Sequence, residues 1–247
     1  MSAYGLFASY YDALTKNVEY ARRAEHFLAL LERHGCHPSQ LLDLACGTGS
    51  LSLCFSQRGM DVIAVDGSAE MLSVARQKAE DAGADILFLQ QRMERLDLYG
   101  TVEAVICALD SVNHLLSPAA VRRTFERVSL FLEPGGLFAF DANTLYKQER
   151  ILGDQTFVYD EPGVFCVWQN RWDPRQKRTH IQLDFFEKNG ALYRRSQERF
   201  AEQAYASDDL EDWLRKAGLE PLGRFGEFSF SPPAVNAERI VYLAKKV

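Results

Sequence analysis

One stretch of the chain limits what it can fold into. Residues 41–49 read Leu-Leu-Asp-Leu-Ala-Cys-Gly-Thr-Gly, an apolar run that ends in Gly47 and Gly49, and a helix-like segment starts at Ser50. A strand that turns through glycines into a helix leaves backbone N–H groups unpaired at the edge of a sheet. A ligand can approach them closely, because glycine has no side chain. The stretch predicts a nucleotide-like binding turn in an α/β fold.

Strand-like and helix-like segments alternate through the first part of the chain. We expect strands at 41–45, 61–66, 86–90, 104–109 and 137–141. We expect helices at 18–34, 50–58, 68–82 and 118–132. The strand at 104–109 is apolar throughout, as a strand covered on both faces should be. This alternation predicts an α/β fold with a doubly wound, mostly parallel sheet.

The pattern changes after about residue 145. Three further segments look like strands of an antiparallel sheet, at 164–172, 179–188 and 192–202. Asn189-Gly190, between the last two, is a strong hairpin signal. We therefore expect a small antiparallel β cap at 150–205, inserted into an α/β domain formed by 1–149 and 206–247.

The end of the chain returns to the main domain. A helix is expected at 207–217, with Ser207 as its cap, and closing strands are expected at 225–230 and 239–244. With the five earlier strands, the closing pair completes a seven-stranded, mostly parallel sheet of the Rossmann-like type.

Composition argues against several classes of partner. Of the 247 residues 47% are hydrophobic, and the formal net charge is −6. An acidic chain disfavours nucleic acid and anionic membranes, whose phosphates need a basic face. No apolar run approaches the ~20 residues that cross a bilayer, and no secretory signal is visible. Five cysteines without a C-x-x-C pair predict reduced thiols, no metal site and a cytoplasmic location.

Asp66 adds a second ligand signal, because it ends the strand that follows the glycine turn. A carboxylate there can accept charge-assisted hydrogen bonds from both hydroxyls of a ribose. With the turn, it indicates a ligand of the adenosine type. The register runs Gly47, Gly49 and then Ser52, so the third glycine of a G-x-G-x-x-G dinucleotide turn is missing. These residues alone leave two nucleotide classes open.

Three ordered motifs, at 43–49, 66–72 and 91–93, resemble those of the class I S-adenosylmethionine-dependent methyltransferases. Pro134-Gly135-Gly136 before a strand is also typical of that family. The resemblance covers nearly the whole chain and is closest to the small-molecule branch with an antiparallel insertion after the fifth strand. It implies transfer of a methyl group from S-adenosyl-L-methionine to a nitrogen or oxygen of a small molecule by in-line displacement, with S-adenosyl-L-homocysteine as product.

The resemblance also implies roles for individual residues. Asp43 would hold the cofactor's amino group, Asp66 its ribose hydroxyls and Met71 its adenine face. Tyr11 and Tyr20 would close over the methionyl end, with segment 7–12 as a lid. The implied cofactor contacts are Tyr11, Tyr20, Asp43, Ala45, Cys46, Gly47, Thr48, Gly49, Asp66, Gly67, Ser68, Met71, Gln91, Arg92, Met93, Ala108, Leu109 and Asp110.

The chain departs from that family at Arg92. Relatives often carry an acid just before the methionine, where it accepts a hydrogen bond from the adenine amino group. Arginine can only donate, so Gln91 or Glu94 becomes the expected acceptor, or the contact is missing.

Two candidate catalytic residues, His114 and Asp110, lie just past the fourth strand. A sulfonium methyl is already electrophilic, so the protein has to position the acceptor and exclude water. An amine or hydroxyl acceptor must also lose a proton, and a side chain at the carboxyl edge of the sheet could take it. For His114, a purely structural role is an equally good interpretation.

Two other functions are compatible with the same residues. A nicotinamide-dependent oxidoreductase would share the fold and Asp66 but lacks its third glycine. A binding module without turnover would keep the pocket, because binding and productive geometry are separate requirements. Trp168 and Trp172 would pack the insert onto the main domain or line a substrate entrance. The sequence names neither the methyl acceptor nor the oligomeric state.

Overall fold

The structure is a computed structural model that describes residues 5–247. The strands of its main sheet are β1 (Gln40–Leu44), β2 (Asp61–Asp66), β3 (Ile86–Gln90), β4 (Val102–Cys107), β5 (Leu132–Asn143), β10 (Leu219–Gly226) and β11 (Arg239–Lys246). Their order is β10-β11-β5-β4-β1-β2-β3. Strands β1 to β5 pair in parallel, and β11 and β10 extend the sheet antiparallel. This arrangement confirms the expected seven-stranded, mostly parallel sheet.

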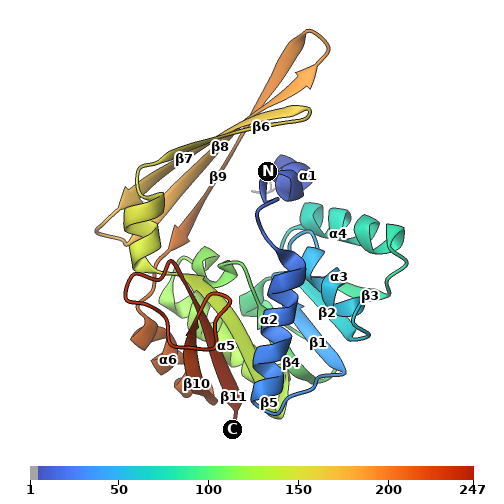
Figure 1. The fold of residues 1–247 in the computed structure, drawn as a ribbon, viewed down its shortest axis with the longest axis vertical. Helices are drawn as coiled ribbons and strands as arrows, with labels where there is room; N and C mark the ends of the chain where they lie inside the picture. The colour runs from blue at the N-terminus through green and yellow to red at the C-terminus, as the bar shows by residue number, and fades with distance from the viewer. Residues whose placement is uncertain (1–4) are drawn as a thin grey trace.

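Helices cover both faces of that sheet (Figure 1). They are α2 (Tyr20–Arg33), α3 (Ser50–Ser56), α4 (Ala69–Asp81), α5 (Pro118–Phe131) and α6 (Ser207–Lys216). Helix α1 (Gly5–Leu14) packs instead on α4 and on strands of the second sheet. The short helical segments are η1 (Met93–Arg95), η2 (Ser111–His114) and η3 (Lys147–Leu152). Phe125 of α5 packs in one core and Phe27 of α2 in the other. Val105 and Ile106 of β4 point into opposite cores. Burial on both faces explains why β4 is apolar from Ala104 onward, whereas Glu103 near its start is only half-buried.

A second sheet, here called the cap sheet, follows the carboxyl end of β5 by way of η3. Its antiparallel strands are β6 (Thr156–Glu161), β7 (Val164–Asp173), β8 (Arg178–Asn189) and β9 (Leu192–Gln203). Figure 1 shows it as a long twisted ladder at the top of the view, beside α1. The cap sheet confirms the expected antiparallel insertion and adds β6, an edge strand that the sequence did not predict.

The last expected strands were only partly right. The strand at 225–230 is wrong, because β10 ends at Gly226 and Phe228 has a left-handed φ of 54°. Ser207 does not cap α6: Ala206 is the cap residue, and the Ser207 hydroxyl pairs with the Tyr242 hydroxyl at 2.7 Å.

Other boundaries in the structure also differ from the predicted ones. Residues 134–136 lie inside β5 rather than before it. The turn between β8 and β9 consists of Gly190 and Ala191, since Asn189 pairs with Leu192. Strand β4 ends at Cys107, so Ala108 and Leu109 belong to the loop after it. Segment 7–12, expected as a lid, is part of helix α1.

Two findings bear on the environment of the chain. Within residues 5–247, no helix has both the length and the apolar character needed to span a membrane. None of the five cysteines forms a disulfide.

Candidate cofactor and substrate site

The glycine turn and Asp66 meet at the carboxyl ends of β1 and β2. The Asp66 carboxylate accepts the backbone N–H of Gly47 at 2.9 Å and that of Ser68 at 2.8 Å. Burial raises the pKa of Asp66, and these N–H groups act in the opposite direction. Asp66 therefore ties the turn after β1 to the start of α4.

The two glycines of the turn are required for different reasons. Both are left-handed, with φ of 55° at Gly47 and 71° at Gly49. A Cβ at Gly47 would meet no atom within 4 Å, and Gly47 lines a cavity. A Cβ at Gly49 would lie 2.9 Å from the Cβ of Ala75 on α4. Gly49 lies outside the cavity lining, so its role is packing, whereas Gly47 keeps the cavity open.

A cavity of about 1060 Å³ extends from this turn to the cap sheet. Ligand pockets usually span about 300–1,000 Å³, so the space suffices for a nucleotide-like cofactor and a second small molecule. All of the expected cofactor contacts except Gly49 line it, as does His114. Sequence reasoning missed further lining residues, among them Lys147, Phe200, Glu202 and Arg239. Trp168 also lines it, as one of its two interpretations predicted.

Asp43 is the buried acid of the turn. Its side chain is 2% exposed and accepts a hydrogen bond from the Ser52 hydroxyl at 2.5 Å. Burial raises the pKa of Asp43 to about 7, Ser52 opposes the rise, and nearby Asp66 adds to it. A carboxyl group in this state gains strongly from a cation placed beside it.

Near η1 the two expected adenine acceptors have different surroundings. The Gln91 side chain pairs with the Asp97 backbone: its Nε2 donates to the Asp97 carbonyl at 2.8 Å, and its Oε1 accepts the Asp97 N–H at 2.7 Å. The adenine contact of Gln91 stays a prediction, and these two hydrogen bonds favour Glu94 as the acceptor. Glu94 lines the cavity, 3.9 Å from the outward-facing Arg92.

The loop after β4 contains two successive left-handed residues, Leu109 (φ 58°) and Asp110 (φ 54°). Non-glycine residues adopt this conformation at a cost of about 1–2 kcal/mol each. The buried Asp141 carboxylate of β5 accepts the N–H of Leu109 at 3.0 Å and of Asp110 at 2.7 Å. Asp141 thus holds the loop in a conformation that the chain alone disfavours.

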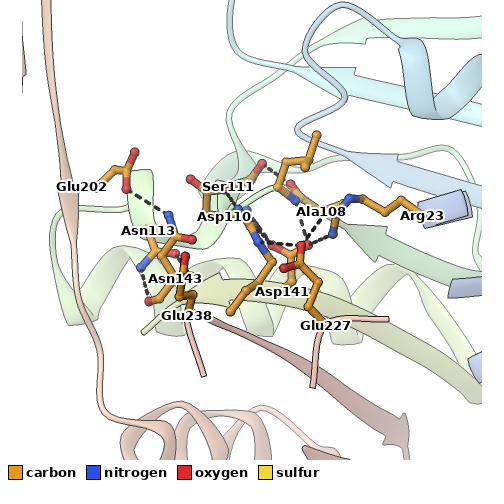
Figure 2. A network of polar contacts seen from close by, with 12 residues as sticks. Arg23, Ala108, Asp110, Ser111, Asn113, Asp141, Asn143, Glu202, Glu227 and Glu238 are labelled. Carbon is orange, nitrogen blue, oxygen red and sulfur yellow. Dashed lines mark hydrogen bonds and ion pairs between the residues drawn. The ribbon is translucent and has the colours of Figure 1, made fainter. Parts of the chain in front are cut away.

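Arginines complete this network (Figure 2). Arg239 of β11 donates to both Asp141 and Asp110, the latter at 2.7 Å, and Arg23 of α2 lies 3.4 Å from Asp141. Burial acts to raise the pKa of Asp110, but Arg239, Lys147 and His114 together outweigh it and the pKa is lowered. Asp110 is therefore an ionised, ion-paired carboxylate.

His114 and Glu202 line the cavity beside strand β9 of the cap sheet. His114 ends η2, and its ring lies against Phe200 of β9 with centroids 5.6 Å apart. Glu202, also on β9, is 4% exposed and accepts from Gln148 at 2.5 Å and Asn143 at 3.3 Å, both at Oε2. Atoms of Asp110, His114 and Glu202 that could bind a cation lie within 4.8 Å of one another. The sequence did not predict this group, because only the cap-sheet topology places Glu202 there.

Helix α1 joins the two ends of the cavity. Asp12 accepts from Thr48 of the cofactor turn at 2.8 Å and from Lys78 of α4 at 2.6 Å. The ring of Phe7 stacks on that of Phe200 in the cap sheet, with centroids 6.0 Å apart. The Tyr11 side chain lines the cavity, and burial raises its pKa well above the usual value.

Known proteins match this chain over nearly its whole length. A family model described as a methyltransferase domain matches residues 41–136. Putative methyltransferase YqeM of Bacillus subtilis (strain 168) is 31% identical over 241 residues, which cover 97% of this chain and 96% of that protein. The crystal structure of an S-adenosylmethionine-dependent methyltransferase from Clostridium acetobutylicum has a TM-score of 0.88 at 31% identity and covers 99% of each chain.

A more distant structure shares the fold: CalS10, described as an amino pentose methyltransferase from Micromonospora echinaspora, has a TM-score of 0.76 at 20% identity and covers 96% of each chain. The chain belongs to the class I S-adenosylmethionine-dependent methyltransferases, and S-adenosylmethionine is its cofactor. This assignment decides against the nicotinamide-dependent alternative, in agreement with the missing third glycine.

Proposed function

We propose that the protein methylates a nitrogen or oxygen atom of a small molecule bound beneath the cap sheet. The observation that carries this proposal is the single cavity of about 1060 Å³, with the cofactor turn at one end and the cap sheet at the other. A relative of 29% identity over 76% of this chain, from Cereibacter sphaeroides, is described as a ubiquinone biosynthesis O-methyltransferase. A small acceptor fits a covered cavity better than a macromolecule does.

The residues present fit the cofactor. Gly47 leaves space that a side chain would fill. Asp43 is a buried acid suited to the ammonium group, and Asp66 lies where a carboxylate meets ribose hydroxyls. In our proposal Met71 packs on the adenine, Glu94 accepts from its amino group, and Tyr11 and Tyr20 cover the methionyl end.

The chemistry requires little of the protein beyond positioning. When bound, the cofactor supplies an electrophilic methyl group, whose carbon bonds to the acceptor atom while the electrons of the C–S bond pass to sulfur. The cap sheet and α1 exclude water from the reacting atoms. His114 takes the acceptor's proton, since Asp110 is ion-paired with Arg239 and is the weaker base.

We also propose that residues 1–149 and 206–247 hold the cofactor and that residues 150–205 cover the acceptor. A cytoplasmic location and a lack of nucleic acid partners stay predictions from composition. A binding module without turnover remains the alternative function.

A direct test combines binding and turnover. We expect S-adenosylhomocysteine to bind in calorimetry, and we expect tritium from methyl-labelled S-adenosylmethionine to appear in products when small amines, alcohols and phenols are offered. Asp66→Ala should weaken S-adenosylhomocysteine binding about tenfold or more, because a charged acceptor of ribose hydroxyls is lost. Tight binding of S-adenosylhomocysteine without labelled product from any acceptor would favour the binding module.

A further inference from the structure

The acceptor end of the cavity has an excess of negative charge. Four carboxylates and three cations of the described residues gather there: Asp110, Asp141, Glu202 and Glu227, with Arg23, Arg239 and Lys147. Arg239 contacts Asp110, Asp141 and Glu227, and Arg23 contacts Asp141 and Glu227. Three cations cannot match four carboxylates, so one of these carboxylates lacks a cation of its own among these residues.

Glu202 is where that charge lies. Its two hydrogen bonds come from the amides of Gln148 and Asn143, and both go to Oε2. Amide donors orient a carboxylate without neutralising it. Figure 2 shows the carboxyl group of Glu202 with one oxygen toward Asn143 and the other turned away from it. Since Glu202 also lines the cavity, its second oxygen is available to a bound molecule.

The surroundings suit an organic cation. Glu202 lies beside Asp110 and His114, with candidate ligand atoms within 4.8 Å of one another. Aromatic side chains line the same end, namely Phe7, Trp168 and Phe200. Aromatic faces attract cations and offer a flat wall for the rest of the molecule. A divalent metal ion is a poorer match, because Arg239 lies 2.7 Å from Asp110 and would repel a double charge more strongly.

We propose that the methyl acceptor is an amine, which binds as its ammonium form between Glu202, Asp110 and His114, and that Glu202 is the residue that selects it over a hydroxyl compound. The inference rests on the proposed function and names its substrate class. One N–H proton of the ammonium passes to the imidazole of His114, and the electron pair of that bond stays on nitrogen for attack on the methyl group. Burial first, and then Asp110, raise the pKa of Glu202, so its ionised form gains most from the cation.

The test measures binding to the protein saturated with S-adenosylhomocysteine. The probes are matched pairs: benzylamine with benzyl alcohol, tryptamine with tryptophol, and glucosamine with glucose. Titrations followed by calorimetry should show at least one amine bound about tenfold or more tightly than its hydroxyl partner. Equal or tighter binding of the hydroxyl partners, or no binding of any amine at 10 mM (about the weakest affinity measurable here), would overturn the proposal.

Variants separate the charge of Glu202 from its shape. Glu202→Gln should weaken binding of the amine about tenfold or more while leaving S-adenosylhomocysteine affinity unchanged. Glu202→Asp, which keeps the carboxylate, should recover part of the loss. Asp160→Asn removes an exposed acid of β6 in the same sheet and should change nothing. Thermal unfolding of each variant establishes that it is folded, and full amine affinity in a folded Glu202→Gln protein would contradict the assignment.

Two controls keep the outcomes distinct. S-adenosylhomocysteine binding reports the cofactor site alone, so its loss would count against the proposed function rather than the substrate class. Amine binding is repeated with EDTA and then with added Mg²⁺ or Mn²⁺. Loss of binding in EDTA and its recovery with metal would overturn the amine assignment in favour of a metal site; unchanged binding supports it.

Discussion

Asp43 shows how one buried carboxyl group makes cofactor binding depend on pH. Its pKa is raised to about 7 by burial, so in the free protein it holds a proton below that pH and carries a charge above it. A raised pKa in the folded state also means that its contribution to stability is present at acid pH and lost as the pH rises through 7. Burial favours the protonated form of Asp43, whereas an ammonium group beside the carboxylate favours its ionised form.

We therefore expect S-adenosylhomocysteine affinity to rise with pH up to about 7, by about tenfold per unit at the steepest, and then to level off. Calorimetry between pH 5.5 and 8 measures this. Ser52→Ala removes a hydrogen bond that lowers the pKa of Asp43, so the levelling point should move to higher pH. Asp43→Asn should give weak binding with a flat profile; an unaltered slope in that variant would assign the dependence to another group.

Gly47 and Gly49 form a matched pair for mutation, because both are left-handed and only one lines the cavity. Gly49→Ala places a methyl group 2.9 Å from Ala75 and should lower the free energy of unfolding by about 1–3 kcal/mol with little change in cofactor affinity. Gly47→Ala meets no neighbour and should lower affinity about tenfold, with a stability loss of about 1–2 kcal/mol from backbone strain. Urea unfolding and calorimetry measure the two effects. A larger loss of affinity in Gly49→Ala and a larger loss of stability in Gly47→Ala would contradict the roles given to the two glycines.

The sequence predicted the cofactor half of the site far better than the acceptor half. The turn at 45–49 and Asp66 are contiguous with their own strands, so local pattern places them correctly. Glu202 and Arg239 reach the cavity from β9 and β11, distant in sequence, and nothing in the residues around them signals a site. The pairing of Gln91 with the Asp97 backbone could not be predicted either, because η1 brings the two together.

At the scale of single elements, the loop after β4 depends on β5. Asp141→Asn keeps the shape but removes the charge that pairs with Arg239 and Arg23. We expect the free energy of unfolding to fall by about 3–5 kcal/mol, because two buried cations lose a partner. The backbone amides of Leu109 and Asp110 should then exchange hydrogen about 100-fold faster.

Glu227→Gln is the control for that experiment. Glu227 contacts the same arginines from a more exposed position, with 36% of its side chain accessible, so its loss should cost less than about 1 kcal/mol. If Asp141→Asn and Glu227→Gln lowered the free energy of unfolding equally, Asp141 would have no special role in holding the loop.

Strands with a continuous apolar run were predicted well, whereas the edge strands β6 and β10 were not. Strands β1 and β4 lie inside the sheet with most of their residues buried, which produces such runs. Strand β10 reads Leu-Glu-Pro-Leu-Gly-Arg-Phe-Gly, and proline and glycine are tolerated there because an edge strand pairs on one side only. Its weak pattern shifted the prediction toward the phenylalanines at 228 and 230, whose rings instead pack against His26 of α2.

For the whole molecule, α1 is the piece that holds the cofactor turn and the cap sheet together. Phe7→Ala removes the ring that contacts Phe200 and Trp168, and a buried Phe→Ala change costs about 3–5 kcal/mol. We expect α1 to detach from the cap sheet, so that acrylamide quenches Trp168 more strongly and S-adenosylhomocysteine dissociates about tenfold faster. Tyr99→Ala, at a fully exposed position, is the control. Unchanged quenching and dissociation would show that α1 does not close the cavity.

The position of Asp12 has a consequence for the order of events in each reaction cycle. Because Asp12 contacts Thr48 and Lys78 while Phe7 contacts the cap sheet, we expect the first helix to move aside when the nucleoside enters or leaves. Steady-state kinetics should then be sequential and ordered, with S-adenosylmethionine adding first and the demethylated nucleoside departing last. Inhibition by S-adenosylhomocysteine would be competitive against S-adenosylmethionine and noncompetitive against the acceptor. The slowest step at saturation would be a motion of the chain rather than the making of a bond.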